Sequence, residues 1–191
     1  PPSNVVAGAA MAPAVVVALQ DAAGNEVPTA TDSVTLTLIN GVGGATLGGT
    51  RTVAAVAGRA TFANLTVDRA GAGYRLVPAA ASLARDTSAV FTVAPAAASV
   101  VAFTQQPSDV VAGAAMAPAV RVEVRDAFGN VMTTYADTVT VTLANSPSGD
   151  TLAGTRKVVA TAGVATFAGL TLQKAATGYQ LAASALGVAG T

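Results

Sequence analysis

The chain contains nearly the same sequence twice. Its segment Val5–Pro13 (VVAGAAMAP) recurs as Val110–Pro118, and the residues from Pro2 to Asp86 align without a gap with later ones. More than half of these aligned pairs are identical. A repeat of about 105 residues has the size of one β-sandwich domain, and tandem arrays of one module are typical of spacers and repeated binding surfaces. The repetition therefore predicts a structural or adhesive role.

The composition argues against several other classes of function. The 191 residues include no cysteine and no histidine, so disulfides, thiol nucleophiles and the commonest general base and metal ligand are absent. Ten basic and ten acidic residues give a net charge of zero, and we expect no basic surface for nucleic acid. We therefore predict that the chain is not an enzyme, needs no cofactor and binds no nucleic acid.

Equivalent segments near the start of each copy predict a β-strand. Val120–Arg125 alternates valine with charged residues, which is the pattern of a half-buried strand with its valines in the core. The equivalent segment, Val15–Gln20 (VVVALQ), is uncharged, as are all residues from 1 to 20. We expect no membrane span there, because Gly8 and Pro13 interrupt the segment and its twin carries charges.

Alternation with period two continues along both copies and predicts about seven short strands in each. Phe62 and Phe167 are expected to anchor the two cores, and the alanine-rich stretch 79–84 to form a loop or irregular edge. The predicted fold class is all-β, with two tandem immunoglobulin-like Greek-key β-sandwiches arranged end to end. The strands are expected at 15–20, 34–38, 50–56, 60–67, 74–77, 89–93, 100–104, 120–125, 139–143, 155–161, 165–172 and 179–182.

The predicted domain boundary lies in the short proline-containing joint at residues 94–99 (APAAAS). Repeat 1 comprises residues 1–94 and repeat 2 residues 95–191, and a stiff joint predicts modules held end to end. We expect repeat 1 to lack a counterpart of the strand 100–104, and repeat 2 a counterpart of the strand 89–93. Either the repeats belong to a longer array, which we favour, or another chain supplies these strands.

Several motifs occur once in each copy and in the same order. They are D-x-x-G-N after a valine-rich strand (17–27 and 122–132), V-T-x-T-L, G-x-A-T-F and A-x-x-G-Y-x-L. Together they cover essentially the whole chain and resemble bacterial immunoglobulin-like (Big) tandem repeats of invasin- and intimin-type surface adhesins. The resemblance implies a rigid extracellular stalk, with receptor contact often left to a terminal domain.

Two acidic turns, Asp21–Glu26 and Asp126–Asn130, are candidate calcium loops, because oxygen ligands cluster in both. The second copy has Val131 where the first has Glu26. Asp and Asn side chains also close hairpin turns by hydrogen bonding to the local backbone. We favour the hairpin turn and keep calcium binding as the alternative.

Tyr74 and Tyr179 stand at equivalent positions, after a glycine-containing corner and before an inward-facing leucine. This context predicts the structural tyrosine corner of immunoglobulin-like sandwiches. The alternative is that both side chains are exposed and contact a ligand.

Val16, Ala18 and Gln20 are expected to face outward, at positions where the second copy carries charged residues. The first copy would then expose an uncharged strip to solvent, whereas the second copy carries charged side chains at the equivalent positions. We predict that a neighbouring module or subunit covers this strip, so that Val16→Arg disturbs assembly and leaves the fold intact. These three residues form the candidate assembly contact.

The function expected from the sequence is that of a non-catalytic module of a bacterial cell-surface or secreted protein, acting as an extracellular stalk, spacer or adhesion repeat. The expected partners are neighbouring repeats, other copies of the chain, and a host or surface receptor. The first alternative is a subunit of an extracellular fibre or pilus assembled by strand donation. The second is an accessory carbohydrate-binding module, although three Tyr, five Phe and no Trp offer few stacking platforms.

Overall fold

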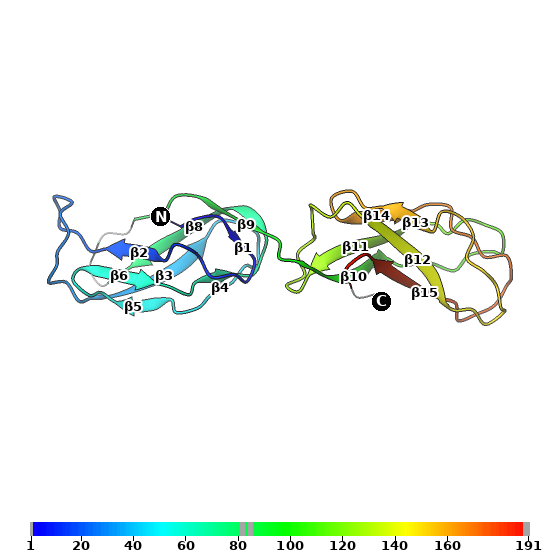
Figure 1. The fold of residues 1–191 in the computed structure, drawn as a ribbon, viewed down its shortest axis with the longest axis horizontal. Helices are drawn as coiled ribbons and strands as arrows, with labels where there is room; N and C mark the ends of the chain where they lie inside the picture. The colour runs from blue at the N-terminus through cyan, green and yellow to red at the C-terminus, as the bar shows by residue number, and fades with distance from the viewer. Residues whose placement is uncertain (1, 81–82, 84–85, 189–191) are drawn as a thin grey trace. The chain divides into compact units, whose positions relative to one another are not determined.

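The computed structural model describes residues 2–80, 83 and 86–188, and every regular element in them is a β-strand (Figure 1). The all-β prediction is confirmed for this part of the chain. Internal contacts divide the chain into two compact units, Pro1–Pro95 and Ala96–Thr191. This division falls one residue beyond the predicted boundary. The end-to-end arrangement of the two repeats stays a prediction.

The first unit is a β-sandwich. One layer is the five-stranded sheet β1-β9-β8-β3-β5, and the other consists of the ladders β2-β6 and β4-β7. β1 pairs parallel with β9, and β8 lies between β3 and β9, as in immunoglobulin-like sandwiches. The strands are β1 (Val5–Val6), β2 (Val15–Ala18), β3 (Ser33–Ile39), β4 (Leu47–Gly48), β5 (Thr52–Ala54), β6 (Arg59–Phe62), β7 (Thr66–Val67), β8 (Gly71–Ala79) and β9 (Phe91–Ala94).

The second unit is also a β-sandwich, built from the sheets β10-β11-β14 and β13-β12-β15. The ladders β2-β6 and β11-β14 occupy equivalent places in the two copies. In the second unit, however, β10 adds a further strand beside β11. The strands are β10 (Ala98–Gln105), β11 (Val120–Asp126), β12 (Thr138–Asn145), β13 (Lys157–Val159), β14 (Val164–Phe167) and β15 (Gln180–Ala185).

The predicted core positions are buried. Phe62 and Phe167 are completely inaccessible to water, as are the three inward-facing valines of β11. Burying one such side chain contributes about 1.5–3 kcal/mol relative to leaving it exposed. The period-two pattern therefore located the faces of the main strands correctly, because alternate side chains of a strand point to opposite sides of the sheet.

The predicted continuous strand at 60–67 is wrong. The structure divides it into β6, which pairs with β2, and β7, which pairs with β4. Asn64 lies at the break, where its side-chain oxygen accepts the backbone N–H of Thr50 at 2.9 Å. The backbone of Asn64 passes so close to Gly49 that a Cβ on that glycine would lie 2.1 Å from the Asn64 carbonyl oxygen. This local contact replaces the regular ladder.

Other predicted boundaries change in both copies. The strands expected at 50–56 and 155–161 shrink to β5 and β13, and the strand expected at 165–172 ends at Phe167 as β14. The strands expected at 74–77 and 179–182 extend further as β8, which includes Ala79, and β15. Half of the loop expected at 79–84, residues 81, 82 and 84, lies outside the described residues. These differences leave the strand order and the core unchanged.

Candidate assembly site

In the second unit, β10 covers one edge of β11. The two strands pair antiparallel, with Val101 opposite Val124 and Phe103 opposite Val122. Val101 is completely buried, and Phe103 packs against the same hydrophobic cluster. β10 therefore does two things at once, because its backbone extends the sheet while its inward side chains complete one side of the core.

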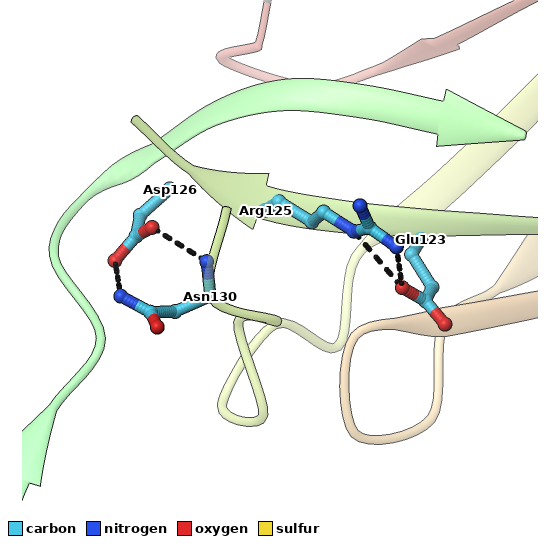
Figure 2. A network of polar contacts seen from close by, with 4 residues as sticks. All are labelled: Glu123, Arg125, Asp126 and Asn130. Atoms are coloured by element: carbon cyan, nitrogen blue, oxygen red, sulfur yellow. Dashed lines mark hydrogen bonds and ion pairs between the residues drawn. The ribbon is translucent and has the colours of Figure 1, made fainter. Parts of the chain in front are cut away.

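The turn after β11 also holds the chain that leads into β10. The carboxylate of Asp126 accepts the backbone N–H groups of Phe128 and Asn130 at 2.9 and 2.8 Å, and the side-chain amide of Asn130 at 2.9 Å. Figure 2 shows the two contacts with Asn130. The same carboxylate accepts the backbone N–H of Ala96 at 2.9 Å. Asp126 therefore fixes the entry of β10 as well as its own turn.

The electrostatics of this turn favour the ionised carboxylate. Burial raises the pKa of Asp126, but the hydrogen bonds from Asn130, Ala96 and Phe128 outweigh burial and shift the pKa below its ordinary value. Next to the turn, Arg125 forms an ion pair with Glu123 at 2.7 Å on the outer face of β11 (Figure 2). These two charges neutralise each other beside the strand edge.

The first unit has the same turn in an exposed setting. Asp21 accepts the backbone N–H groups of Ala23 and Asn25 at 2.9 Å each, and the side-chain amide of Asn25 at 3.1 Å. The hydrogen bonds from Asn25 lower the pKa of Asp21. Asp21 and Asn25 are exposed, whereas Asp126 and Asn130 are 1% and 8% exposed. The difference follows from the joint, which covers only the second turn among the described residues.

The edge of β2 that corresponds to the β10 side of β11 has no paired strand among the described residues. β2 pairs with β6, and the N–H of Leu19 donates to the carbonyl of Gly58 on that same side at 2.8 Å. Because backbone groups along a strand alternate in direction, the N–H groups of Val16 and Ala18 point to the opposite edge. We call this the outer edge of β2.

A groove of about 550 Å³ lies beside the outer edge of β2. β2 forms one wall, and side chains of β3 and β8, including Val34 and Leu76, line the groove toward the core. The other described residues that line it include Pro2, Ala80, Leu83 and residues 86–89. Val17 is half-buried at this place, whereas its counterpart Val122 is completely buried beneath β10. The groove therefore occupies the position that Val101 and Phe103 fill in the second unit.

The three residues of the candidate assembly contact lie along the outer edge of β2. Val16 is 45% exposed, Gln20 is exposed, and Ala18 is half-buried. In the second unit the corresponding positions carry Arg121 and the ion pair of Glu123 with Arg125. The uncharged strip is thus on the surface of the first unit, and its burial by a neighbour stays a prediction.

The two tyrosines hold the corners of their units. The hydroxyl of Tyr74 donates to the carbonyl of Arg69 at 2.9 Å, and that of Tyr179 donates to the carbonyl of Lys174 at 2.8 Å. Each bond reaches five residues upstream, which is the geometry of a tyrosine corner. Tyr74 is also stacked on Phe91 of β9, with ring centroids 5.7 Å apart, and burial raises its pKa.

A second groove, of about 380 Å³, lies in the second unit beside Tyr179 and Leu181. Val110 and Met116 form part of its other wall. In the first unit the equivalent place is filled by β9, between β1 and β8. Tyr179 is half-buried there, whereas Tyr74 is buried against β9.

The described residues form no other candidate site. Among them, no group of three or more Asp or Glu side chains could hold a metal ion. Asp126 and Asn130 are the buried polar side chains in this part of the chain, and both belong to the turn. No helix in the described part has the length and hydropathy needed to cross a membrane.

Sequence reasoning anticipated the strand positions at both grooves but missed the contact between Ala96 and Asp126. Those residues are 30 positions apart, and neither belongs to a motif that predicts pairing with the other. The only signal in the sequence is that the same Asp and Asn recur in both copies. This recurrence predicts the turn but not the hydrogen bond from Ala96 to Asp126.

No protein-family model matches the chain, and no curated protein sequence matches it either. Several solved structures show a partial likeness. The Escherichia coli adhesin FdeC is 20% identical over 97% of this chain and 57% of its own, with a TM-score of 0.44. A β-glycosidase from Bacteroides vulgatus is 13% identical over 100% of this chain and 24% of its own, also with a TM-score of 0.44. A β-glucuronidase from Parabacteroides merdae is 14% identical over 84% of this chain and 20% of its own, with a TM-score of 0.37.

The chain thus spans a little over half of the adhesin structure and about a quarter of the β-glycosidase structure. One of the three neighbours is named as an adhesin and two as glycosidases, and the TM-scores are low. The likeness therefore specifies no function for this chain.

Proposed function

We propose that this chain is a pair of non-catalytic structural modules from an extracellular stalk or adhesive region of a bacterial cell-surface or secreted protein. The observation that supports this best is the repetition of the same core and the same turn in both copies. In the described residues, the carboxylates of Asp21 and Asp126 accept hydrogen bonds from the backbone of their own turns. Such hydrogen bonds stabilise a module, which suits a structural role.

The strand order of the first unit also suits a load-bearing module. β1 near one end of the unit and β9 at the other pair parallel, with Val5 opposite Val93 and Val6 opposite Ala94. Tension applied to the two ends of the unit would pull these strands in opposite directions along their axes. All hydrogen bonds of the pair would then resist together, whereas a hairpin opens one bond at a time.

Single-molecule pulling of the chain between its two ends tests the proposal. We expect two separate unfolding events, one for each unit. Each event should release about 300 Å of chain, from about 3.3–3.6 Å per residue less the folded span. Val5→Pro, which removes a backbone donor from β1, should lower the unfolding force of the first unit and leave the second unchanged.

A single unfolding event for the whole chain, or no force difference between the wild-type chain and the Val5→Pro variant, would contradict a load-bearing role. The extracellular location has its own test. Antibodies against the chain should label intact, unpermeabilised source cells or their secreted fraction, and labelling confined to permeabilised cells would argue against that location.

A further inference from the structure

The outer edge of β2, the groove beside it and the Asp21 turn reproduce the place that β10 occupies in the second unit. We propose that they form a docking site for an extended strand with the chemistry of Ala98–Gln105, which we call a β10-type strand, supplied by a neighbouring module of the same kind. This inference rests on the proposed modular function and deepens it, because it names what completes one module in an array.

The side chains of a β10-type strand fit the groove in the register seen in the second unit. There, Val101 and Phe103 lie opposite Val124 and Val122. The equivalent positions of the first unit are Leu19 and Val17. Val17 is the inward-facing residue of β2 that is left half-buried, so the incoming phenylalanine would cover the apolar surface that remains in contact with water.

The backbone of β2 supplies the second element of recognition. The N–H and C=O groups of Val16 and Ala18 point to the outer edge, where a strand can add to the sheet by main-chain hydrogen bonds. These bonds are independent of sequence. The groove provides the selectivity, because it accepts alternate apolar side chains of valine and phenylalanine size.

The Asp21 turn supplies the third element. In the second unit, Oδ2 of Asp126 accepts both the side-chain amide of Asn130 and the N–H of Ala96. In the first unit, Oδ2 of Asp21 accepts the amide of Asn25 at 3.1 Å. The same oxygen can therefore receive the N–H of a residue that precedes a docked strand, as its counterpart does.

Pairing between two copies of β2 would satisfy this surface less well. Val15 of β2 and Leu19, which directly follows β2, are already buried in their own core, whereas Val17 is half-buried. Two outer edges placed together would bond through their backbones but would leave both grooves unfilled. A single β10-type strand would both fill the groove with its side chains and form backbone hydrogen bonds with the outer edge of β2. We therefore assign the site to that occupant.

The test uses the whole chain and a synthetic peptide with the sequence of residues 95–106 (PAAASVVAFTQQ), labelled at its C-terminus. We expect saturable binding with one peptide per chain, measured by fluorescence anisotropy. A peptide with Val101→Asp and Phe103→Asp should bind at least about tenfold more weakly, because both charges would be buried. A matched peptide with Val100→Asp and Ala102→Asp carries the same charges on its outward face and should retain its affinity.

A variant of the chain provides the second control. Residues 96–105 are fused directly before Pro1, so that the fused segment fills the groove of the first unit as β10 fills its place before Pro107. This variant should no longer bind the peptide. It should also protect the amides of Val16 and Ala18 from hydrogen exchange at least about tenfold more strongly than the parent chain does.

Three outcomes would overturn the assignment. They are no binding of the peptide, equal affinity for the parent and fused chains, and self-association of the parent chain that the peptide does not compete with. The last would place a second copy on the outer edge. Two separate unfolding events under tension, without peptide binding, would leave the structural role standing and reject only the docking site.

Discussion

Asp126→Ala is expected to destabilise the second unit much more than Asp21→Ala destabilises the first. Both carboxylates close the same turn, and Asp126 also accepts the N–H of Ala96. Asp126 is 1% exposed, whereas Asp21 lies at the surface. Both aspartates stabilise their turn, but only Asp126 also holds the joint at Ala96. The difference between the two losses of stability therefore measures the contribution of the joint.

The magnitude follows from the donors that lose their acceptor. In Asp126→Ala, the N–H groups of Ala96 and Asn130 would lose their carboxylate acceptor in a partly or fully buried place. A buried unsatisfied donor costs about 1–3 kcal/mol, so the expected loss is about 2–6 kcal/mol. A unit of this size is stabilised by about 5–15 kcal/mol, so the loss is a large part of the total. In Asp21→Ala, water can replace the carboxylate at the exposed turn.

Scanning calorimetry combined with hydrogen exchange resolves the two units in one molecule. A loss of at least about 2 kcal/mol should lower the melting temperature of the second unit by at least about 8 °C. Hydrogen exchange should accelerate in residues 96–188 and stay unchanged in the first unit. Asp126→Asn, which keeps one acceptor oxygen, should lie between the wild-type chain and Asp126→Ala. Equal shifts for the Asp21 and Asp126 variants would refute the role assigned to the joint.

Other predictions concern acid stability, packing and the surface. The pKa of Asp126 in the folded chain lies below its ordinary value of 3.8. The stability that the ionised Asp126 contributes should therefore be fully present above pH 3.8 and be lost as the pH falls through the lower pKa of the folded chain. Chemical denaturation at a series of pH values should show this loss for the wild-type chain and not for Asp126→Asn. A Cβ on Gly41 would lie 2.3 Å from the ring of Tyr74, so Gly41→Ala should cost about 2–5 kcal/mol in urea unfolding. Gly73→Ala, with open space around the same atom, should cost less, and equal losses would argue against the packing explanation. Val16→Arg should change stability by less than about 0.5 kcal/mol and reduce any self-association seen by sedimentation, because it adds a charge to the uncharged strip.

Much of this fold can be predicted from the sequence because buried and exposed residues alternate along the main strands. The alternation of valine with charged residues in Val120–Arg125 identifies the inward face, and the repeat transfers that assignment to Val15–Gln20, where no charge marks it. The pattern fails where local contacts replace the ladder. The alternation changes phase at Asn64, because Ala63 and Asn64 are both exposed between the buried Phe62 and Leu65. The contact of Asn64 with Thr50 depends on a residue 14 positions away. Period alone carries no information about that contact.

The candidate site could be predicted only in part for the same reason. Comparison of the two copies identifies the strands that they share, but it says nothing of the groove beside β2. The groove depends on side chains from β3 and β8, which meet beside β2 only after folding. The second role of Asp126 likewise depends on where the joint passes, and the D-x-x-G-N motif is the same whether or not a joint is present.

The stretch 91–105 explains why the two grooves lie at different positions in the two units and yet each lies where the other unit has a strand. Its first part, β9, packs on Tyr74 and completes the first unit, and its last part, β10, fills the core beside β11 in the second. In the proposed docking, a β10-type strand would fill the groove of the first unit, and the groove of the second unit lies at the place that β9 fills in the first. One connector of this design therefore supplies the last strand of one module and the first strand of the next. If the proposed docking is correct, the stability of the first unit would depend on a joint from a neighbouring module as well as on its own core. The hydrogen bond from Ala96 to Asp126 is the contact that holds the joint of the second unit.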